Sequence, residues 1–345
     1  MISSAMIRTL AAPLIGMTVV AIAGCNSFTV SSTIEAATSP KTTSAQTPWK
    51  EVELAHTLNQ DSSPVRTLAI SPDGRTLASG SMNGNLRLWN LRLGKPIKTF
   101  REAASVDSLA FSPNGHILAS GDSTGNVKLW ELDRGKPIHT LIGQRYGIKS
   151  VAFSADGQTV ASGSWDKTVK LWNPTTGNLL RTFIGSASVN AVAFGPSGEI
   201  ACGSYDGIVK VWQADKGEAI GTFPAAADSI YAIAFSPDKQ QFVTGSADGI
   251  VKIWSLQNAD LIYSLTSHRD SVTSLAVSPD GTTLASGSAD KTIKLWNLQT
   301  GTLIRTLAAK RVLALAMSPD GNTLVSSGID GTLRVWKVKD KGLRE

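Results

Sequence analysis

At 345 residues, the chain is long enough for one large domain or for two or three ordinary ones. Its hydrophobic content of 42% can supply a core, and 31 glycines with 14 prolines indicate many turns. The formal net charge of +6 comes from 33 basic residues scattered among 27 acidic ones, with no arginine-rich arm or lysine block. Nucleic-acid binding usually needs such clustering, so this class of function is disfavoured.

The first 25 residues combine one charged residue, Arg8, with an apolar run over 9–24 and then a cysteine. The run is shorter than the roughly 20 apolar residues of a membrane-spanning helix and has the length of a secretory h-region. Its ending, Ile22-Ala23-Gly24-Cys25, resembles a bacterial lipobox. This resemblance implies that residues 1–24 are a lipoprotein signal peptide and that Cys25 is lipidated. The alternative is an uncleaved anchor with an incidental cysteine.

The residues around this segment bear on its start and its destination. A start at Met6 gives the signal peptide a more typical n-region than a start at Met1 does, so either methionine can be the true start. Asn26 follows the cysteine, which resembles lipoproteins that are sent on to the outer membrane. Residues 25–48 are rich in serine and threonine without an apolar face, so we expect a flexible tether. The protein is then secreted across the inner membrane and faces the periplasm, with the outer membrane favoured over the inner one.

From residue 49 onward the sequence repeats itself with a period of about 40 residues. Seven tryptophans end near-identical phrases such as VKLW: Trp89, Trp130, Trp172, Trp212, Trp254, Trp296 and Trp336. Seven turn phrases such as SPDG at Ser71 keep the same spacing, and proline, aspartate and glycine are residues that tight turns prefer. Each period also holds short β-type runs. Four short antiparallel strands in about 40 residues are the pattern of a propeller blade.

These phrases resemble the WD-repeat β-propeller family over residues 49–339, which leaves 340–345 as a C-terminal tail. The chain ends soon after Trp336, so the last blade lacks its fourth strand. However, the run 52–58 precedes the first blade and matches the pattern of the outer strands. We therefore predict an all-β fold, a seven-bladed β-propeller of four-stranded antiparallel blades. The N-terminal strand completes blade seven and removes an exposed sheet edge.

The family resemblance also implies a buried hydrogen-bond network in each blade, made by a turn aspartate, a histidine, a serine or threonine and the tryptophan. The aspartate is present in five blades: Asp166, Asp206, Asp248, Asp290 and Asp330. The histidine position is filled only in blade six, by His268, so this blade alone can build the whole set, with Asp290, Trp296 and Ser286 or Ser288. The networks of the other blades are in doubt, and packing around the ring is expected to replace them.

The sequence carries no recognisable catalytic motif. HExxH, GxSxG, a phosphate-binding glycine loop and a paired Cys-His cluster are all missing, so we expect no enzyme activity, no cofactor and no metal. Cys202 is interpreted as an inert core thiol that does not pair with Cys25. The inner strands carry only three charged residues, Arg66, Asp107 and Lys149. The alternative function, an envelope enzyme or small-ligand binder at the central channel, needs polar side chains that converge from several inner strands.

One pair of neighbouring blades departs from the rest. The residue before each turn aspartate, or its equivalent, is aromatic only in blades three and four, at Trp165 and Tyr205. The loop that enters blade three adds Arg145 and Tyr146, and these residue types dominate protein-binding hot spots. We predict that the four residues form a partner-binding patch. The alternative is that Trp165 covers the seam between its own blade and the next one.

These inferences together predict a membrane-anchored, non-enzymatic protein-interaction scaffold of the bacterial cell envelope. The propeller is expected to be monomeric and to bind a protein partner through the loops on one of its faces. The absence of a catalytic set and the single aromatic patch carry this prediction, because a fold alone does not establish a function.

Overall fold

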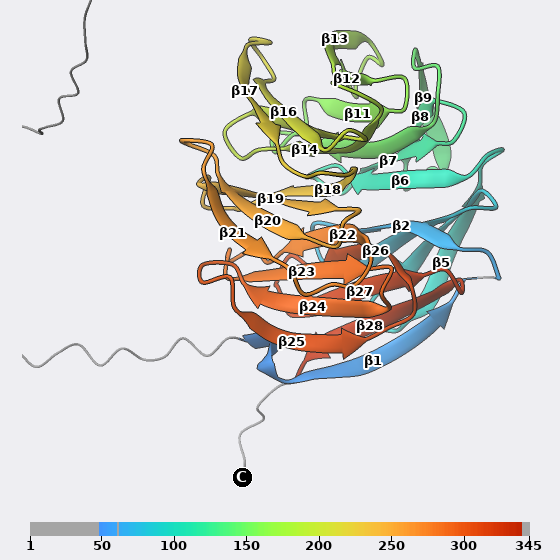
Figure 1. Ribbon diagram of the computed structural model, residues 1–345. Helices are drawn as coiled ribbons and strands as arrows, with labels where there is room; N and C mark the ends of the chain where they lie inside the picture. The colour runs from blue at the N-terminus through green and yellow to red at the C-terminus, as the bar shows by residue number, and fades with distance from the viewer. Residues whose placement is uncertain (1–47, 61, 340–345) are drawn as a thin grey trace, which may run out of the picture. The chain divides into compact units, whose positions relative to one another are not determined.

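The computed structural model describes residues 48–60 and 62–339. The predicted signal peptide, the lipidation site at Cys25, the tether up to residue 47 and the tail 340–345 lie outside the described residues. The described part is all-β apart from one short 3-10 helix, η1 (Pro48–Lys50) (Figure 1). No helix in residues 48–60 and 62–339 is long and apolar enough to cross a membrane.

Seven antiparallel sheets of four strands each form the blades, and in each sheet the strands follow one another outward from the centre of the ring. The innermost strands are β2 (Val65–Ile70), β6 (Val106–Phe111), β10 (Ile148–Phe153), β14 (Val189–Phe194), β18 (Ile230–Phe235), β22 (Val272–Val277) and β26 (Val312–Met317). The second strands are β3 (Thr76–Ser81), β7 (Ile117–Asp122), β11 (Val160–Ser164), β15 (Glu199–Ser204), β19 (Gln241–Ser246), β23 (Thr283–Ser288) and β27 (Thr323–Gly328).

The two outer positions of each blade follow the same order. The third strands, which contain the repeated tryptophans, are β4 (Asn85–Asn90), β8 (Asn126–Glu131), β12 (Thr168–Trp172), β16 (Ile208–Gln213), β20 (Val251–Ser255), β24 (Thr292–Asn297) and β28 (Thr332–Val338). The outermost strands are β5 (Lys95–Arg101), β9 (Lys136–Ile142), β13 (Leu179–Ile184), β17 (Ala219–Pro224), β21 (Leu261–Leu265), β25 (Leu303–Ala308) and β1 (Val52–Asn59).

The repeated turn phrase forms the tight connection between the first and second strands of each blade. The hydroxyl of Ser71 donates to Oδ1 of Asp73 at 2.5 Å, and the same oxygen accepts the N–H of Arg75 at 3.0 Å. Gly74 takes a φ of 69°, which a glycine adopts without steric cost. Five more blades repeat the serine contact with an aspartate or asparagine, at Ser112, Ser154, Ser236, Ser278 and Ser318. The turn assigned from sequence is therefore confirmed.

The repeated tryptophans fill the seams between neighbouring blades. All seven are at least nine-tenths buried, and the described chain has seven apolar clusters, one at each seam. At the seam of blades one and two, for example, the ring of Trp130 in β8 lies 5.2 Å from that of Phe100 in β5. Each tryptophan thus packs against the preceding blade and holds its own blade in the ring.

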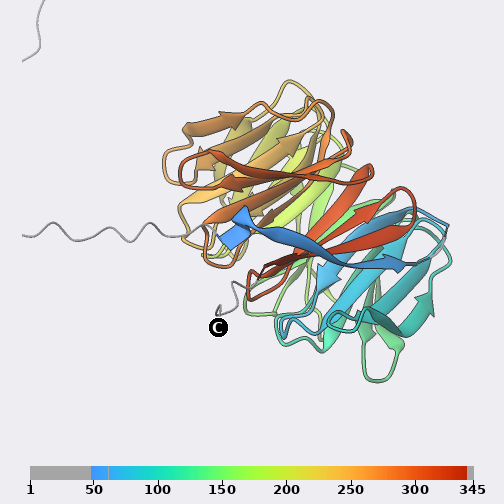
Figure 2. The same ribbon diagram turned by 90° about the horizontal axis from the view of Figure 1, so that it is seen from below.

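The N-terminal strand closes the ring. Strand β1 pairs antiparallel with β28, from Val52 opposite Val338 to Asn59 opposite Thr332, and Figure 2 shows the blue strand running along the red ones. At the centre, β2 contacts both β6 and β26, so the inner strands also form a continuous circle. The predicted seven-bladed propeller, with its last blade completed by the N-terminal strand, is confirmed.

Candidate binding site at the mouth of the central channel

A shift in strand register occurs near the start of every inner strand. In β2, Val65 pairs with Ser81 and Thr67 pairs with Gly80, so Arg66 has no partner in the register. An extra residue of this kind is a β-bulge, which bends the strand and re-aims a side chain. The same shift leaves out one residue in each of the other inner strands: Asp107, Lys149, Asn190, Tyr231, Thr273 and Leu313. These six residues and Arg66 are named the bulge ring.

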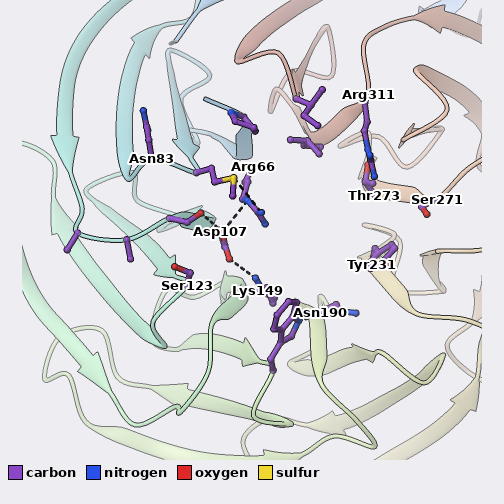
Figure 3. A pocket seen from close by; sticks show the side chains of 18 residues that line it. Arg66, Asn83, Asp107, Ser123, Lys149, Asn190, Tyr231, Ser271, Thr273 and Arg311 are labelled. Atoms are coloured by element: carbon purple, nitrogen blue, oxygen red, sulfur yellow. Dashed lines mark hydrogen bonds and ion pairs between the residues drawn. The ribbon is translucent and has the colours of Figure 1, made fainter. Parts of the chain in front are cut away.

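The bulge ring lines one cavity of about 1010 Å³ at the mouth of the central channel (Figure 3). Its other walls are the loops that enter the inner strands and the turns between second and third strands. In each blade the N–H of the turn residue donates to the carbonyl of the residue before the inner strand, as Met82 does to Pro64 at 3.0 Å. The side of the ring that carries these loops and turns is named the loop face. Every blade contributes to the cavity, and its size suits a ligand or several inserted side chains.

The three charged residues noted in the sequence do converge in this cavity. Nζ of Lys149 lies 2.6 Å from Oδ2 of Asp107, and Nε of Arg66 lies 3.6 Å from Oδ1. The hydroxyl of Ser105 donates to the same carboxylate at 2.6 Å. The Asp107 side chain is only 4% exposed, so its negative charge is held by its neighbours and is not open to a ligand.

The predicted patch lies on two connected turns of the loop face. In blade three, the N–H of Arg145 donates to Oδ2 of Asp166 at 3.0 Å, which fixes the entering loop against the turn that carries Trp165. That turn is joined to the turn of blade four through Ser188, whose hydroxyl donates to the carbonyl of Trp165 at 3.0 Å. The carbonyl of Ser188 in turn accepts the N–H of Tyr205 at 2.9 Å.

Trp165 combines the two roles that the sequence left open. Its Nε1 donates to Oδ1 of Asn190 in blade four at 3.0 Å, so the indole reaches across the seam. Half of its surface nevertheless stays exposed, as does most of Tyr146 (62%) and Tyr205 (63%). Nζ of Lys149 lies 4.1 Å from the centre of the indole ring, a cation–π contact. Of the four predicted patch residues, only Trp165 lines the cavity.

The carboxylate of the cavity and the described thiol of the chain are both held by their surroundings. The one carboxylate that lines the cavity is already paired with Lys149. The thiol of Cys202 lies in the core, where burial raises its pKa to about 11 and keeps it protonated at neutral pH. In residues 48–60 and 62–339, no group of three or more His, Cys, Asp or Glu side chains is placed to hold a metal ion.

Two protein families match the chain. The family described as WD domain, G-beta repeat matches residues 52–90, 94–131, 135–173 and 177–213. The family described as IFT122 first beta-propeller matches residues 198–345. The chain belongs to the WD-repeat β-propeller family. No curated protein matches it. WD-repeat propellers are in general protein-interaction scaffolds and are typically not enzymes.

Blade six contains the complete WD-repeat network. Nδ1 of His268 lies 2.8 Å from Oδ2 of Asp290, and its Nε2 lies 2.8 Å from the hydroxyl of Ser286. The indole N–H of Trp296 donates to the same hydroxyl at 2.9 Å, so Ser286, not Ser288, is the serine of the set. In all five blades that have the turn aspartate, its carboxylate also accepts the N–H two residues further on, at Thr168, Ile208, Ile250, Thr292 and Thr332.

Of the networks left in doubt by the sequence, those of blades one to three are present in altered form. In blade three, Oε1 of Gln144 accepts the hydroxyl of Ser162 at 2.6 Å, and Trp172 donates to that serine at 2.9 Å. In blade two, Glu102 accepts from the serine at 2.5 Å and pairs with Nζ of Lys128 at 2.7 Å. Gln60 makes the corresponding contact with the serine of blade one.

These three residues are functional equivalents of histidine that the sequence search missed. Gln144 and Glu102 stand four residues before the leading aliphatic residue of the inner strand, as His268 does, so their spacing is that of the network although their residue type is not. Gln60 stands five residues before its strand. A hydrogen-bond acceptor within reach of the buried serine is the physical requirement, and the oxygen of a carboxamide or a carboxylate meets it as well as an imidazole nitrogen does.

Proposed function

We propose that the protein is a protein-interaction scaffold of the bacterial cell envelope, and that its loop face binds a protein partner. The observation that carries this proposal is the cavity at the mouth of the channel, beside exposed Tyr146, Trp165 and Tyr205. Aromatic side chains with a wide exposed surface lose little conformational freedom on binding and dominate interface hot spots. WD-repeat propellers commonly act in this way, and the lack of an unpaired carboxylate in the cavity supports a role without catalysis.

We further propose that lipidated Cys25 anchors the propeller to a membrane after secretion, and we favour the outer membrane. The apolar run 9–24 and the lipobox-like ending before the cysteine support this proposal. Metabolic labelling of the full chain with a radioactive fatty acid tests it. We expect label in the wild type and none in Cys25→Ser. Continued labelling of that variant would rule out Cys25 as the sole lipid site.

Capture of the partner tests the scaffold proposal. The purified propeller is crosslinked in envelope extracts, with wild type, Trp165→Ala and Leu179→Ala compared side by side. Leu179 is the matched control, because it is 48% exposed in the same blade but opens β13, next to Trp172 at the other end of β12. Trp165→Ala should weaken capture by about 1–4 kcal/mol in binding free energy, whereas Leu179→Ala should leave it unchanged. Equal capture by all three proteins would contradict a role for the loop face.

A second candidate function is the binding of a small ligand in the central channel. The cavity favours it, because polar side chains converge there from six of the seven inner strands. The two candidates are separated by the mass of what binds. Native mass spectrometry of the propeller recovered from extracts would detect a compound of low mass in the second case and a protein in the first.

A further inference from the structure

The cavity at the mouth of the channel carries an excess of positive charge. Three basic side chains line it, those of Arg66, Lys149 and Arg311, against one acidic side chain, that of Asp107. Its formal net charge is therefore +2. Because Lys149 and Asp107 form a close ion pair at 2.6 Å, the excess is carried by the two arginines.

Both arginines retain unused hydrogen-bond donors. The side chain of Arg66 is 40% exposed, and its contacts with Asp107 and with the sulfur of Met82 are long, at 3.6 and 3.9 Å. Arg311 is exposed and makes no ion pair with any residue that the structure describes. A guanidinium has five N–H groups in a planar fork that matches a carboxylate. Figure 3 places Arg66 beside Asp107 and Lys149, and places Arg311 beside Thr273 on the other side of the opening.

In residues 48–60 and 62–339, no hydrogen bond joins the Arg311 guanidinium to a neighbouring side chain. The hydroxyls of Thr273 and Ser271 donate to backbone carbonyls, those of Val312 and Ala247, at 2.9 and 3.2 Å. The hydroxyl of Tyr231, also in the cavity wall, has no hydrogen-bond partner within residues 48–60 and 62–339 and can donate to a ligand. On the opposite side, by contrast, the protein itself provides a carboxylate, Asp107, which lies among an arginine, a lysine and a serine.

The same geometry opposes a cationic ligand. An exposed indole is the usual binding surface for a cation, but one face of Trp165 already carries Nζ of Lys149 at 4.1 Å. A second cation would also meet the net positive charge of the wall without an open carboxylate to offset it. Charge complementarity therefore selects an anionic occupant.

We propose that the cavity binds carboxylate side chains from an acidic segment of a protein partner, one held by Arg66 and another by Arg311, with Tyr231 as a further donor. This inference rests on the proposed scaffold function and names the chemistry of the partner. The cavity of about 1010 Å³ is far larger than a single ion needs, and it has room for the side chains on either side of the acidic residue. The bulges contribute to this selectivity by aiming Arg66 and Tyr231 at the opening, whereas Arg311 lies in the loop before β26.

Fluorescence anisotropy with defined peptides tests the proposal. The probe is a dye-labelled peptide with glutamates and aspartates spaced by glycine and serine, and its matched control has glutamine and asparagine at the same places. We expect the acidic peptide to bind at least tenfold more tightly, because hydrogen bonds to a charged group are stronger than those to a neutral one. Arg66→Gln and Arg311→Gln should each weaken binding about tenfold or more.

Arg92→Gln is the matched control, since Arg92 is exposed, does not line this cavity and gives the same change in net charge. Equal binding of the two peptides, no binding of either, or an equal loss in Arg92→Gln would overturn the proposal. Competition with inorganic phosphate and with free glutamate separates the sources of negative charge. Displacement by phosphate at a concentration at which glutamate has no effect would also overturn it, because the site would then prefer a phosphoryl group.

Partner capture distinguishes a failure of this inference from a failure of the scaffold function. Suppose that the wild type captures a partner, that the double variant Arg66→Gln/Arg311→Gln captures it equally well, and that Trp165→Ala does not. The scaffold function then stands and the proposed carboxylate site is wrong. If the wild type captures no protein but still prefers the acidic peptide, the site stands without the scaffold function. Melting temperatures of all variants close to that of the wild type ensure that folding is not the cause.

Discussion

Two tryptophans seven residues apart in blade three have opposite surroundings. Trp172 is buried at the seam with blade two, and its indole N–H is bonded to Ser162. Trp165 is half exposed and contributes one hydrogen bond and one cation–π contact. We predict that Trp172→Ala lowers the free energy of unfolding by about 3–5 kcal/mol, as core aromatic truncations do. Trp165→Ala should lower it by about 1–2 kcal/mol at most.

Chemical denaturation followed by far-UV circular dichroism measures both values. Trp165→Phe, which keeps a ring but loses the bond to Asn190, is the control for the polar contact. A loss of stability in Trp165→Ala as large as that in Trp172→Ala would mean that Trp165 is a packing residue. It would contradict the proposal that Trp165 is kept half exposed to bind a partner.

The pair of His268 and Asp290 makes the stability of blade six depend on pH. Burial lowers the pKa of His268 below 6.5, although its bond to Asp290 opposes this shift. Burial raises the pKa of Asp290, but hydrogen bonds from Thr292, from the N–H of Arg269 and from His268 outweigh it and lower the pKa to about 2. The unfolded chain therefore binds protons more readily at both groups. Stability should fall below about pH 6.5 because of His268, and again from about pH 4 toward pH 2 because of Asp290.

The contribution of His268 can be isolated with a variant that blade three already suggests. His268→Gln should keep the acceptor for Ser286, as Gln144 does for Ser162, and lose about 1 kcal/mol at pH 7. Melting temperatures between pH 7 and pH 5 should decline less in His268→Gln than in the wild type. Parallel declines would show that this histidine does not titrate on unfolding in that range.

At the scale of single residues, burial was easier to predict than contact. The seven tryptophans were placed correctly because each recurs at a fixed spacing, which only a shared packing role explains. Gln60 was missed because it lies one position outside the spacing of His268, and Glu102 because it has that spacing but carries a carboxylate in place of an imidazole. Arg311 and Tyr231 were also missed at the channel, because their importance depends on what the other blades leave unpaired.

At the scale of elements, the inner strands share one backbone and differ most in the side chain at the bulge. The bulge recurs in all seven, so the backbone fixes where the side chain points, and the sequence at that position fixes what the cavity contains. The strands themselves were predictable from alternation and turn phrases. The bulges were not, because a shift of one residue leaves no mark in a short apolar run.

The short helix η1 places an additional tryptophan between two blades. Trp49 is completely buried and belongs to the apolar cluster that contains Leu307 of β25 and Trp336 of β28. Its Nε1 nevertheless has no hydrogen-bond partner among the described residues. We predict that Trp49→Ala lowers the free energy of unfolding by about 3–5 kcal/mol. Trp49→Phe should change it by only about 1 kcal/mol, because loss of the unpaired N–H offsets part of the lost volume.

Trp336→Phe is the comparison that tests this reasoning. Its indole N–H donates to Ser326 at 3.0 Å, so phenylalanine there leaves a buried hydroxyl without its donor and should cost about 1–3 kcal/mol more than Trp49→Phe. Thermal unfolding of the two variants beside the wild type gives the difference. Equal losses would mean that Nε1 of Trp49 finds a partner after all.

At the scale of the whole molecule, one strand joins the two ends of the propeller. The sequence predicted this closure from a count of outer strands, because six strands for seven blades leave a gap that 52–58 fits. Strand β1 buries Val52 and Leu58 and covers the edge of β28, which would otherwise offer unpaired N–H and C=O groups to other chains. Closure therefore protects against aggregation as well as stabilising the ring.

A chain that begins at residue 60 should expose this edge, whereas a chain that begins at residue 48 keeps it covered. Loss of Val52 and Leu58 alone removes about 3–6 kcal/mol of apolar burial, and Trp49 is lost with them. We expect the shorter chain to melt at a much lower temperature and to form larger species in size-exclusion chromatography. Addition of a synthetic peptide of residues 48–60 should raise its melting temperature in proportion to the logarithm of peptide concentration, because only the folded ring offers the β28 edge and the seam beside β25. If both chains melt at the same temperature, the ring is held closed by its inner strands, and β1 is dispensable for stability.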